Sequence, residues 1–312
     1  MSFSGETKTE LCRQPIQRVC CAKAEAYGML LFCNTFQPTG IRIVTENRAF
    51  GARLPKLFHK AFGLTFDRLP GEENCPGKLI FEIRDPGKIE TVINSFGFSM
   101  EQNLSLHINF GLLEEDCCRT AFLRGVFLAG GSVTDPDKRY HLELVTSHYK
   151  VCRELEALMM DMGFFPRETT RSGNFIAYFK QSEHIEDFLT LIGAPVAAMG
   201  IMAAKVEKNL RNEMNRRVNC DTANVSKAVD AAQEQLAAIR RLDEMGKLET
   251  LPEKLRETAA LRMQNPDMTL SQLAECFAPP LTKSCLNHRL RKLVELSRID
   301  EGQKGSSGAA KA

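Results

Sequence analysis

The sequence lacks the features that would place it at a membrane or outside the cell. No apolar run approaches the roughly 18 residues that cross a bilayer, so we expect no membrane contact. The N-terminal stretch MSFSGETKTELCRQ has no apolar core, so we expect no signal peptide. The eleven cysteines are odd in number and follow no secretory signal, which predicts reduced thiols in a cytoplasmic protein. The DNA binding predicted below would make it nucleoid-associated.

Motifs of the common enzyme classes are also missing. The six histidines show neither HxH nor HExxH spacing. The sequence contains no nucleophile elbow, no phosphate-binding glycine loop and no dinucleotide fingerprint. We therefore predict no bound cofactor, no metal site and no catalytic residues of these kinds.

Charge is nearly balanced but unevenly distributed. The formal net charge is only +2, which excludes a polycation. From Lys205 to the end, however, 19 Lys/Arg stand against 15 Asp/Glu, and residues 283–298 hold five basic residues and one acid. Such a local basic patch indicates nucleic-acid binding, and a solvated helix face is the alternative.

The first two hundred residues contain an internal repeat. CCAKAEAYGMLLFCNT (20–35) aligns without a gap with CCRTAFLRGVFLAGGS (117–132), at an offset of 97 residues. The same order of patterns follows each copy: an alternating strand (41–47, 141–147), a helical segment ending at Gly63 or Gly163, a strand (79–85, 175–181) and a helix (86–96, 182–193).

These repeats predict an α+β domain made of two similar halves, residues 1–97 and 98–200. Helices over 22–33 and 119–130 would meet at its centre, and we call their interface the seam. Gly28, Gly125 and Ala129 are small, so the two helix backbones could approach closely there.

The second copy, FLRGVFLAGGS, resembles the LAGLIDADG family of homing endonucleases. The family's Leu, Gly, Ala, Gly and Ser fall on Leu123, Gly125, Ala129, Gly131 and Ser132. The resemblance implies a nuclease fold in which an acid at the end of each seam helix holds a divalent metal over the scissile phosphates. Here those positions are Cys33 and Gly130, so we predict a domain without nuclease activity.

The C-terminal third has a different character. Residues 203–247 are polar and helix-forming, and predict one or two long helices with an interruption near 219–222, where Asp221 or Thr222 could cap the second. Three short helices follow, over 253–264 after Pro252, 270–277 after the N-cap Thr269, and 283–299 after the N-cap Thr282. We predict a linker helix over 201–225, an all-α helix-turn-helix domain over 226–302, and a disordered tail over 303–312.

The last of these helices has the two faces that a recognition helix needs. Leu286, Leu290, Leu293 and Ser297 share one face at helical spacing. The opposite face can read base edges, and flanking cations can contact phosphates. The predicted DNA-binding residues are Thr269, Ser271, Lys283, Ser284, Asn287, His288, Arg289, Arg291 and Lys292. An ordinary amphipathic surface helix is the alternative.

Taken over nearly its whole length, the sequence resembles the bacterial WhiA family. The resemblance rests on SFSGETKTEL, on FLRGVFLAGGSVTDPDKRYHLELVT, on RNEMNRRVNCDTANVSKAVDAA and on SCLNHRLRKL. The first repeat departs from the nuclease motif, with Asn34 at a glycine position and Phe32 at an alanine position. The resemblance implies a DNA-binding transcription regulator of the cell cycle, tied to cell division and chromosome segregation, and to sporulation in actinobacteria.

Two other functions stay open. One is a metal-dependent nuclease with a relocated acid, Asp135 or Glu143, although Asp135 in TDPDK also reads as a turn residue. The other is a protein that docks on transcription or cell-division partners and binds double-stranded DNA only weakly and without sequence preference.

Two cysteine pairs, Cys20-Cys21 and Cys117-Cys118, occupy equivalent places in the repeats. Four thiols could hold zinc if the halves brought them together. Adjacent cysteines are poor chelators, however, so the sequence favours buried thiols that act as small hydrophobic groups.

Overall fold

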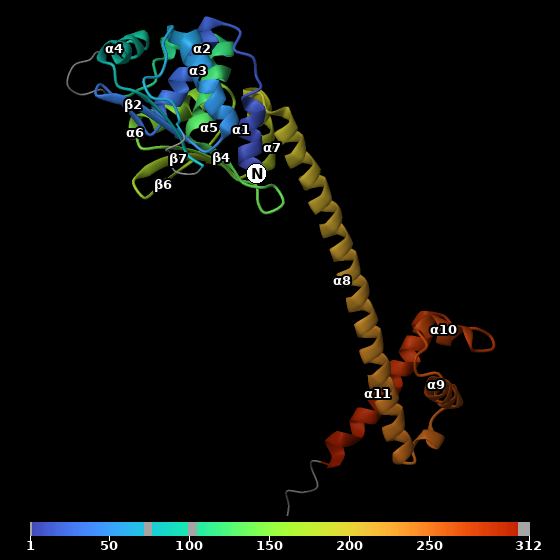
Figure 1. Ribbon diagram of the computed structural model, residues 1–312. Coiled ribbons are helices and arrows are strands. Elements are labelled where there is room, and N and C mark those ends of the chain that lie inside the picture. The colour runs from blue at the N-terminus through green and yellow to red at the C-terminus, as the bar shows by residue number, and fades with distance from the viewer. Residues whose placement is uncertain (1, 72–76, 99–104, 305–312) are drawn as a thin grey trace, which may run out of the picture. The chain divides into compact units, whose positions relative to one another are not determined.

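The computed structural model describes residues 2–71, 77–98 and 105–304 (Figure 1). The chain forms two compact units, Met1–Asn209 and Leu210–Ala312, and each has its own hydrophobic core. The boundary falls inside one helix, α8 (Pro195–Glu244). Within the described ranges, no helix is both long enough and apolar enough to cross a bilayer.

The N-terminal unit contains the two predicted halves. The first half consists of α1 (Phe3–Leu11), α2 (Val19–Leu31), β1 (Thr35–Gln37), β2 (Gly40–Thr45), α3 (Arg48–Phe62), β3 (Leu79–Ile83) and α4 (Pro86–Ser95). The second consists of the 3-10 helix η1 (Phe110–Leu112), α5 (Asp116–Gly130), β4 (Gly131–Val133), β5 (Leu142–Thr146), α6 (Tyr149–Asp161), β6 (Arg167–Arg171), β7 (Asn174–Phe179) and α7 (Ser182–Ile192). The predicted repeat is confirmed, whereas α1 and the exposed strand β6 were not predicted.

Each half has an antiparallel sheet, ordered β1-β2-β3 in the first and β4-β5-β7-β6 in the second. The pairings are equivalent, because Ile43 lies opposite Phe81 in the first sheet and Leu144 opposite Ala177 in the second. The glycines predicted to stop the helices do so in the left-handed conformation, Gly63 with φ 72° and Gly163 with φ 85°.

Helices α2 and α5 form the seam, as predicted, and pack backbone against backbone. A Cβ atom on Gly28 would lie 2.2 Å from the carbonyl oxygen of Phe122, and one on Gly125 would lie 2.0 Å from that of Glu25. Only glycine fits such an approach, and the close packing compensates for its low helix propensity. Because Gly28 and Gly125 are equivalent in the repeat, the two helices meet by the same contact from both sides.

A buried ion pair lies beside this contact. Glu25 of α2 is 2 % exposed and accepts hydrogen bonds of 2.6 and 2.8 Å from Arg53 of α3. Arg124 of α5 adds a third contact with the same carboxylate, at 3.5 Å. The carboxylate is therefore satisfied inside the core, which a buried charge requires.

The C-terminal unit is all-α, as predicted. It contains the end of α8, the 3-10 helix η2 (Leu248–Thr250), α9 (Glu253–Gln264), α10 (Leu270–Glu275) and α11 (Lys283–Lys304). Its core combines Ile239 and Leu242 of α8 with Ala259, Leu273 and the leucines of α11. The predicted interruption near 219–222 is wrong, because α8 continues through it without a cap. The predicted disordered tail falls mostly on 305–312, outside the described residues.

Candidate nucleic-acid interface

Helix α11 is held by the apolar face that the sequence predicted. Leu286, Leu290 and Leu293 are each at most 1 % exposed and lie in the core of the C-terminal unit. Ser297, also fully buried, donates its hydroxyl hydrogen bond to the carbonyl oxygen of Val294. At the start of the helix, the hydroxyl of Thr282 accepts from the amide of Cys285 at 3.2 Å. This cap fixes where the helix begins.

The opposite face of α11 is open to solvent. Ser284, Asn287, His288 and Arg291 are all exposed. Within the part of the chain that the structure describes, no hydrogen bond or ion pair holds these four side chains. Their donors and acceptors are therefore available to a ligand. The spacing i, i+3, i+4 and i+7 aligns them along one stripe of the helix.

The flanking cations differ from one another. Lys283 and Lys292 are exposed, and Lys292 makes only a surface ion pair of 3.5 Å with Glu295. Arg289 is half-buried, with its guanidinium 5.7 Å from the centre of the Phe277 ring. Arg289 was predicted among the DNA-binding residues; in the structure its guanidinium lies over Phe277, a contact that helps to hold α11 against the preceding turn.

The short helix α10 has a structural role at its first residues. The hydroxyl of Thr269 and the side chain of Gln272 form a reciprocal capping box. Thr269 was predicted to bind DNA, and its hydroxyl is engaged in this cap, with 2.9 Å to Oε1 of Gln272. Ser271, also predicted, lies two residues after Thr269 and is exposed.

One residue that orients these helices gave no sequence signal. Arg262, at the end of α9, is 2 % exposed, and its guanidinium donates to the carbonyl oxygen of Met268 at 2.6 Å. This bond joins the end of α9 to the turn before α10. The amide of Leu281 in turn donates to the carbonyl of Ala274 at 3.0 Å, which closes the segment between α10 and α11.

The nuclease positions at the seam offer no metal ligand of the hard oxygen type. The thiol of Cys33 donates to the carbonyl oxygens of Leu30 and Thr35, each at 3.2 Å. Burial raises the pKa of the Cys33 thiol to about 12, so it is protonated at neutral pH. A neutral thiol bonded to backbone carbonyls is a poor ligand for Mg²⁺, which prefers charged oxygen.

Gly130 not only lacks a carboxylate but leaves no space for one. A Cβ atom there would lie 2.5 Å from the carbonyl oxygen of Val145 and 2.8 Å from Cδ1 of Phe32. Such distances are below van der Waals contact, and the first obstacle is backbone rather than a mobile side chain. Any side chain at this position would have to displace strand β5.

The two candidate relocated acids are committed elsewhere. Glu143 lies 3.2 Å from Arg171 and 3.4 Å from His141. Burial would raise the pKa of Glu143, but these two partners hold it below its usual value. Asp135 accepts the amide of Asp137 at 3.0 Å, which is the turn role that the sequence indicated.

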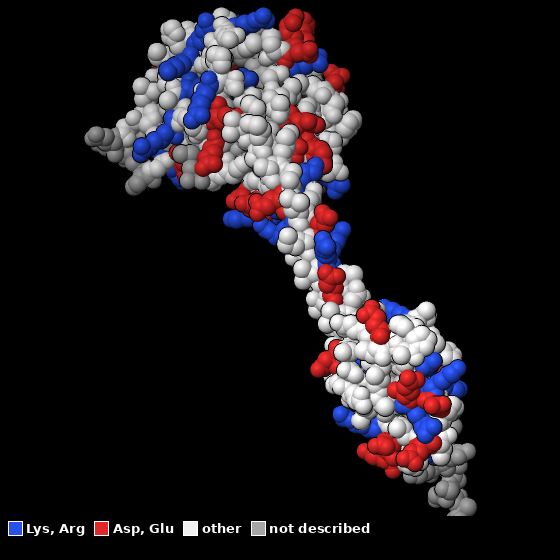
Figure 2. All heavy atoms as spheres, turned by 90° about the vertical axis from the view of Figure 1, so that its right-hand side faces the viewer, with Lys and Arg blue, Asp and Glu red and all other residues white. Residues whose placement is uncertain are grey.

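Basic side chains on the first sheet are also paired. Arg42, Arg68 and Arg84 all lie within 3.7 Å of the single carboxylate of Glu82. Figure 2 shows Lys and Arg gathered toward the left of the N-terminal unit, whereas acidic and basic side chains are mixed on the visible face of the C-terminal unit. The open stripe of α11 is therefore distinguished by its unpaired polar groups rather than by a broad field of positive charge.

Comparison with known proteins agrees with both units. The model of the WhiA C-terminal HTH domain matches residues 214–297, and that of the WhiA LAGLIDADG-like domain matches residues 119–211. The crystal structure of full-length DUF199/WhiA from Thermatoga maritima covers 96 % of this chain and 99 % of its own, with a TM-score of 0.59 and 23 % identity. This likeness shows a shared fold.

Two curated relatives, each called "Probable cell division protein WhiA", match nearly end to end. The one from Alkaliphilus oremlandii is 37 % identical over 97 % of this chain and 99 % of its own length. The one from Heliobacterium modesticaldum is 37 % identical over 98 % of each. With a LAGLIDADG-like domain, a C-terminal helix-turn-helix and this identity over its length, the chain belongs to the WhiA family.

Proposed function

We propose that the protein is a non-catalytic transcription regulator that binds double-stranded DNA through α11 and acts in bacterial cell division. The observation that carries the proposal is the open stripe of α11, with Asn287, His288 and Arg291 exposed opposite a buried row of leucines. The name of the curated relatives supports the cell-division role. Roles in chromosome segregation and sporulation belong to the same proposal.

The side chains of the stripe suit the major groove. Arginine can bond the O6 and N7 atoms of guanine with two hydrogen bonds, and asparagine can do the same for N6 and N7 of adenine. Both side chains project from an α-helix whose width fits the groove. Lys283 and Lys292 flank the stripe and can contact phosphates, which adds affinity without sequence preference.

The seam argues against nuclease activity in the same chain. Phosphodiester hydrolysis by a metal ion requires oxygen ligands at the site. Cys33 is held by backbone carbonyls and Gly130 has no room for a side chain. The N-terminal unit would then serve as a scaffold, a second DNA contact or a docking surface.

Selection of bound sequences from a random duplex library tests the proposal. The full chain should enrich a defined motif, bind it more weakly as salt rises, and bind it equally well with EDTA present. The double variant Asn287→Ala/Arg291→Ala should lose the enrichment. Arg240→Ala removes the same charge from an exposed site on α8 and serves as the matched control.

Three outcomes would contradict the proposal. Equal binding to all library members would favour a docking protein with weak DNA affinity. Loss of binding in the Arg240 variant equal to that in the double variant would remove α11 from its central role. Cleavage of plasmid DNA by the purified chain with Mg²⁺ would restore the nuclease interpretation.

A further inference from the structure

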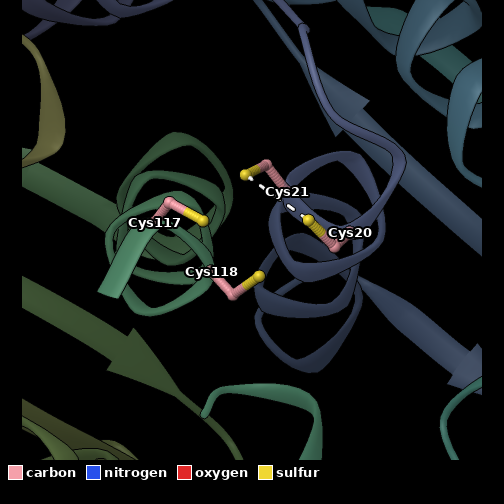
Figure 3. Close-up of side chains that lie close together, drawn as sticks. All are labelled: Cys20, Cys21, Cys117 and Cys118. Atoms are coloured by element: carbon pink, nitrogen blue, oxygen red, sulfur yellow. Dashed lines mark hydrogen bonds between the residues drawn. The ribbon is translucent and has the colours of Figure 1, made fainter. Parts of the chain in front are cut away.

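Four cysteine thiols meet at the start of the seam. Cys20 and Cys21 lie in the first turn of α2, and Cys117 and Cys118 lie in the first turn of α5. Their four sulfur atoms all lie within 4.8 Å of one another. Figure 3 shows the sulfurs arranged around one small space between the two helices, two from each. The sequence repeat has thus placed equivalent residues of both halves at a single point.

This arrangement changes the prediction made from sequence. The expectation of buried thiols is wrong for most of the group: Cys118 is buried, Cys21 and Cys117 are half-buried, and Cys20 is exposed. Adjacent cysteines on one helix diverge and cannot surround an ion. Here, however, each pair supplies only half of a ligand set, and the second helix supplies the other half.

The spacing of the sulfurs fits one tetrahedral ion. Zinc–sulfur bonds of about 2.3 Å place the sulfurs of a tetrahedron about 3.8 Å apart. The sulfurs of Cys20 and Cys21 are 4.0 Å apart, and no pair in the group exceeds 4.8 Å. Rotamer adjustments of less than about 1 Å per sulfur would therefore complete the site.

Burial raises the pKa of the Cys21 and Cys118 thiols, and two features beside them act the other way and favour the thiolate form that a metal binds. Both helices start here, and the positive end of a helix dipole stabilises thiolates. Neither Arg18 nor Glu115, the two N-cap residues, caps its helix with a side-chain hydrogen bond. The guanidinium of Arg18 also lies 3.9 Å from the sulfur of Cys117.

A route for the ion lies beside the group. A pocket of about 270 Å³ is lined by Cys20 and Cys118 together with Glu114 and Glu115. The lining also includes Lys23, so the two acids and one base leave the pocket with a net negative charge, which attracts cations. A metal site needs such access from solvent as well as its ligands.

We propose that Cys20, Cys21, Cys117 and Cys118 bind one Zn²⁺ ion as a structural site that joins the two halves of the N-terminal unit. Four thiolates fill the tetrahedral coordination of zinc, so the site has no open position for catalysis. Binding would release the thiol protons to solvent and leave the oxidation state of sulfur unchanged. Tetrahedral sets of four sulfur ligands are typical of zinc and of iron–sulfur sites, and a single zinc ion completes such a set without added sulfide.

Metal analysis of the full chain, purified under reducing conditions, tests the site. We expect one zinc per chain, and a Co²⁺-substituted chain should show the intense visible and near-ultraviolet bands of tetrahedral cobalt thiolate. Cys20→Ser changes an exposed side chain and should preserve the fold. It removes a direct ligand, so it should weaken zinc binding by more than the roughly 10–100-fold that is lost when a residue hydrogen-bonded to a ligand is replaced. Cys220→Ser, exposed on α8, is the matched control and should bind zinc normally.

Three results would overturn the proposal. The first is a folded, reduced chain that takes up no zinc or cobalt when either is added. The second is iron with acid-labile sulfide, which would assign an iron–sulfur cluster to the cysteines. The third is disulfide formation among these four cysteines in chain that has been kept under reducing conditions. It would appear as an intact mass lowered by the lost hydrogens, and peptide mapping would assign the bonds.

Discussion

The two units of the chain treat their charged side chains in opposite ways. In the N-terminal unit, Arg53 is bound by buried Glu25, and three arginines of the first sheet share the carboxylate of Glu82. In the C-terminal unit, Arg291 of α11 is exposed, and no described residue holds its guanidinium by a hydrogen bond or ion pair. These charges therefore hold elements of the first unit together. In the second unit Arg298 of α11 pairs with Glu234 of α8 in the same way, but the guanidinium of Arg291 is left available for an external partner.

The largest expected loss of stability in the N-terminal unit alone comes from a larger side chain in the seam. Gly125→Leu would place a side chain where even Cβ meets a carbonyl oxygen at 2.0 Å, so we expect a loss of about 3 kcal/mol or more in unfolding free energy. Denaturant unfolding followed by circular dichroism should show an early transition, with the C-terminal transition unmoved. Ala129→Leu, a half-buried seam position, should cost less; equal losses would contradict the close-contact argument.

Removing the arginine of the buried pair should have nearly as large an effect. Arg53→Met leaves the Glu25 carboxylate buried with only the 3.5 Å contact to Arg124, and breaking such pairs costs about 3–5 kcal/mol. Thermal unfolding of the full chain measures this. The double variant Arg53→Met/Glu25→Met should recover most of the loss. If Arg84→Met, which removes an exposed arginine, costs as much, the burial argument fails.

On the second unit, two single changes separate base reading from phosphate contact. Arg291→Ala should lose about 1–3 kcal/mol at one base position of the selected site and relax its preference there. Lys283→Ala should weaken binding to all sequences and reduce the salt slope by about 1. Fluorescence anisotropy on a set of single-base variants distinguishes them, and an Arg291 loss that is uniform over all sites would reassign it to phosphate.

The smallest effect is a pH dependence in the first unit. Asp67 accepts hydrogen bonds from Lys88 and from the amides of Asp85 and Arg84, which together hold its pKa at about 2. Since this value is below that of an unfolded aspartate, the stabilisation is full above about pH 4 and disappears as pH falls through 2. Asp67→Asn should cost about 1 kcal/mol at pH 7, a modest figure because the pair is partly solvated.

Denaturant titrations at a series of pH values measure this dependence. The difference in unfolding free energy between wild type and Asp67→Asn should shrink between pH 4 and pH 2. A constant difference over that range would show that hydrogen-bond geometry, rather than the ionised carboxylate, accounts for the effect of the substitution.

Much of this organisation could be predicted from the sequence, because it rests on local periodicity. The strands, the glycine stops and the apolar face of α11 all follow from spacing within a few residues. The unbroken course of α8 could not be predicted in this way. Asn219 and Asp221 are common helix caps, but here the helix continues through both residues. The stacking of Arg289 on Phe277 depends on the path of the turn between α10 and α11, which residue spacing does not encode.

The same distinction applies to the candidate sites. The exposure of Asn287 and Arg291 followed from the helical wheel, whereas the convergence of four thiols required both halves to be placed in space. Pairs of cysteines in equivalent repeat positions were visible, but the distance between the pairs was not. Arg262, which ties α9 to the turn before α10, looked like any surface arginine in the sequence.

The crowding at Gly130 has a consequence for how this domain can change over evolutionary time. The space that a metal-binding acid would need is occupied by the backbone at Val145 and by the ring of Phe32, which comes from the other half. A single codon change at Gly130 would therefore produce a strained protein rather than a partly active nuclease. Recovery of DNA cleavage would require coordinated changes in both halves. Selection of single substitutions would therefore meet a loss of stability before any gain of nuclease activity.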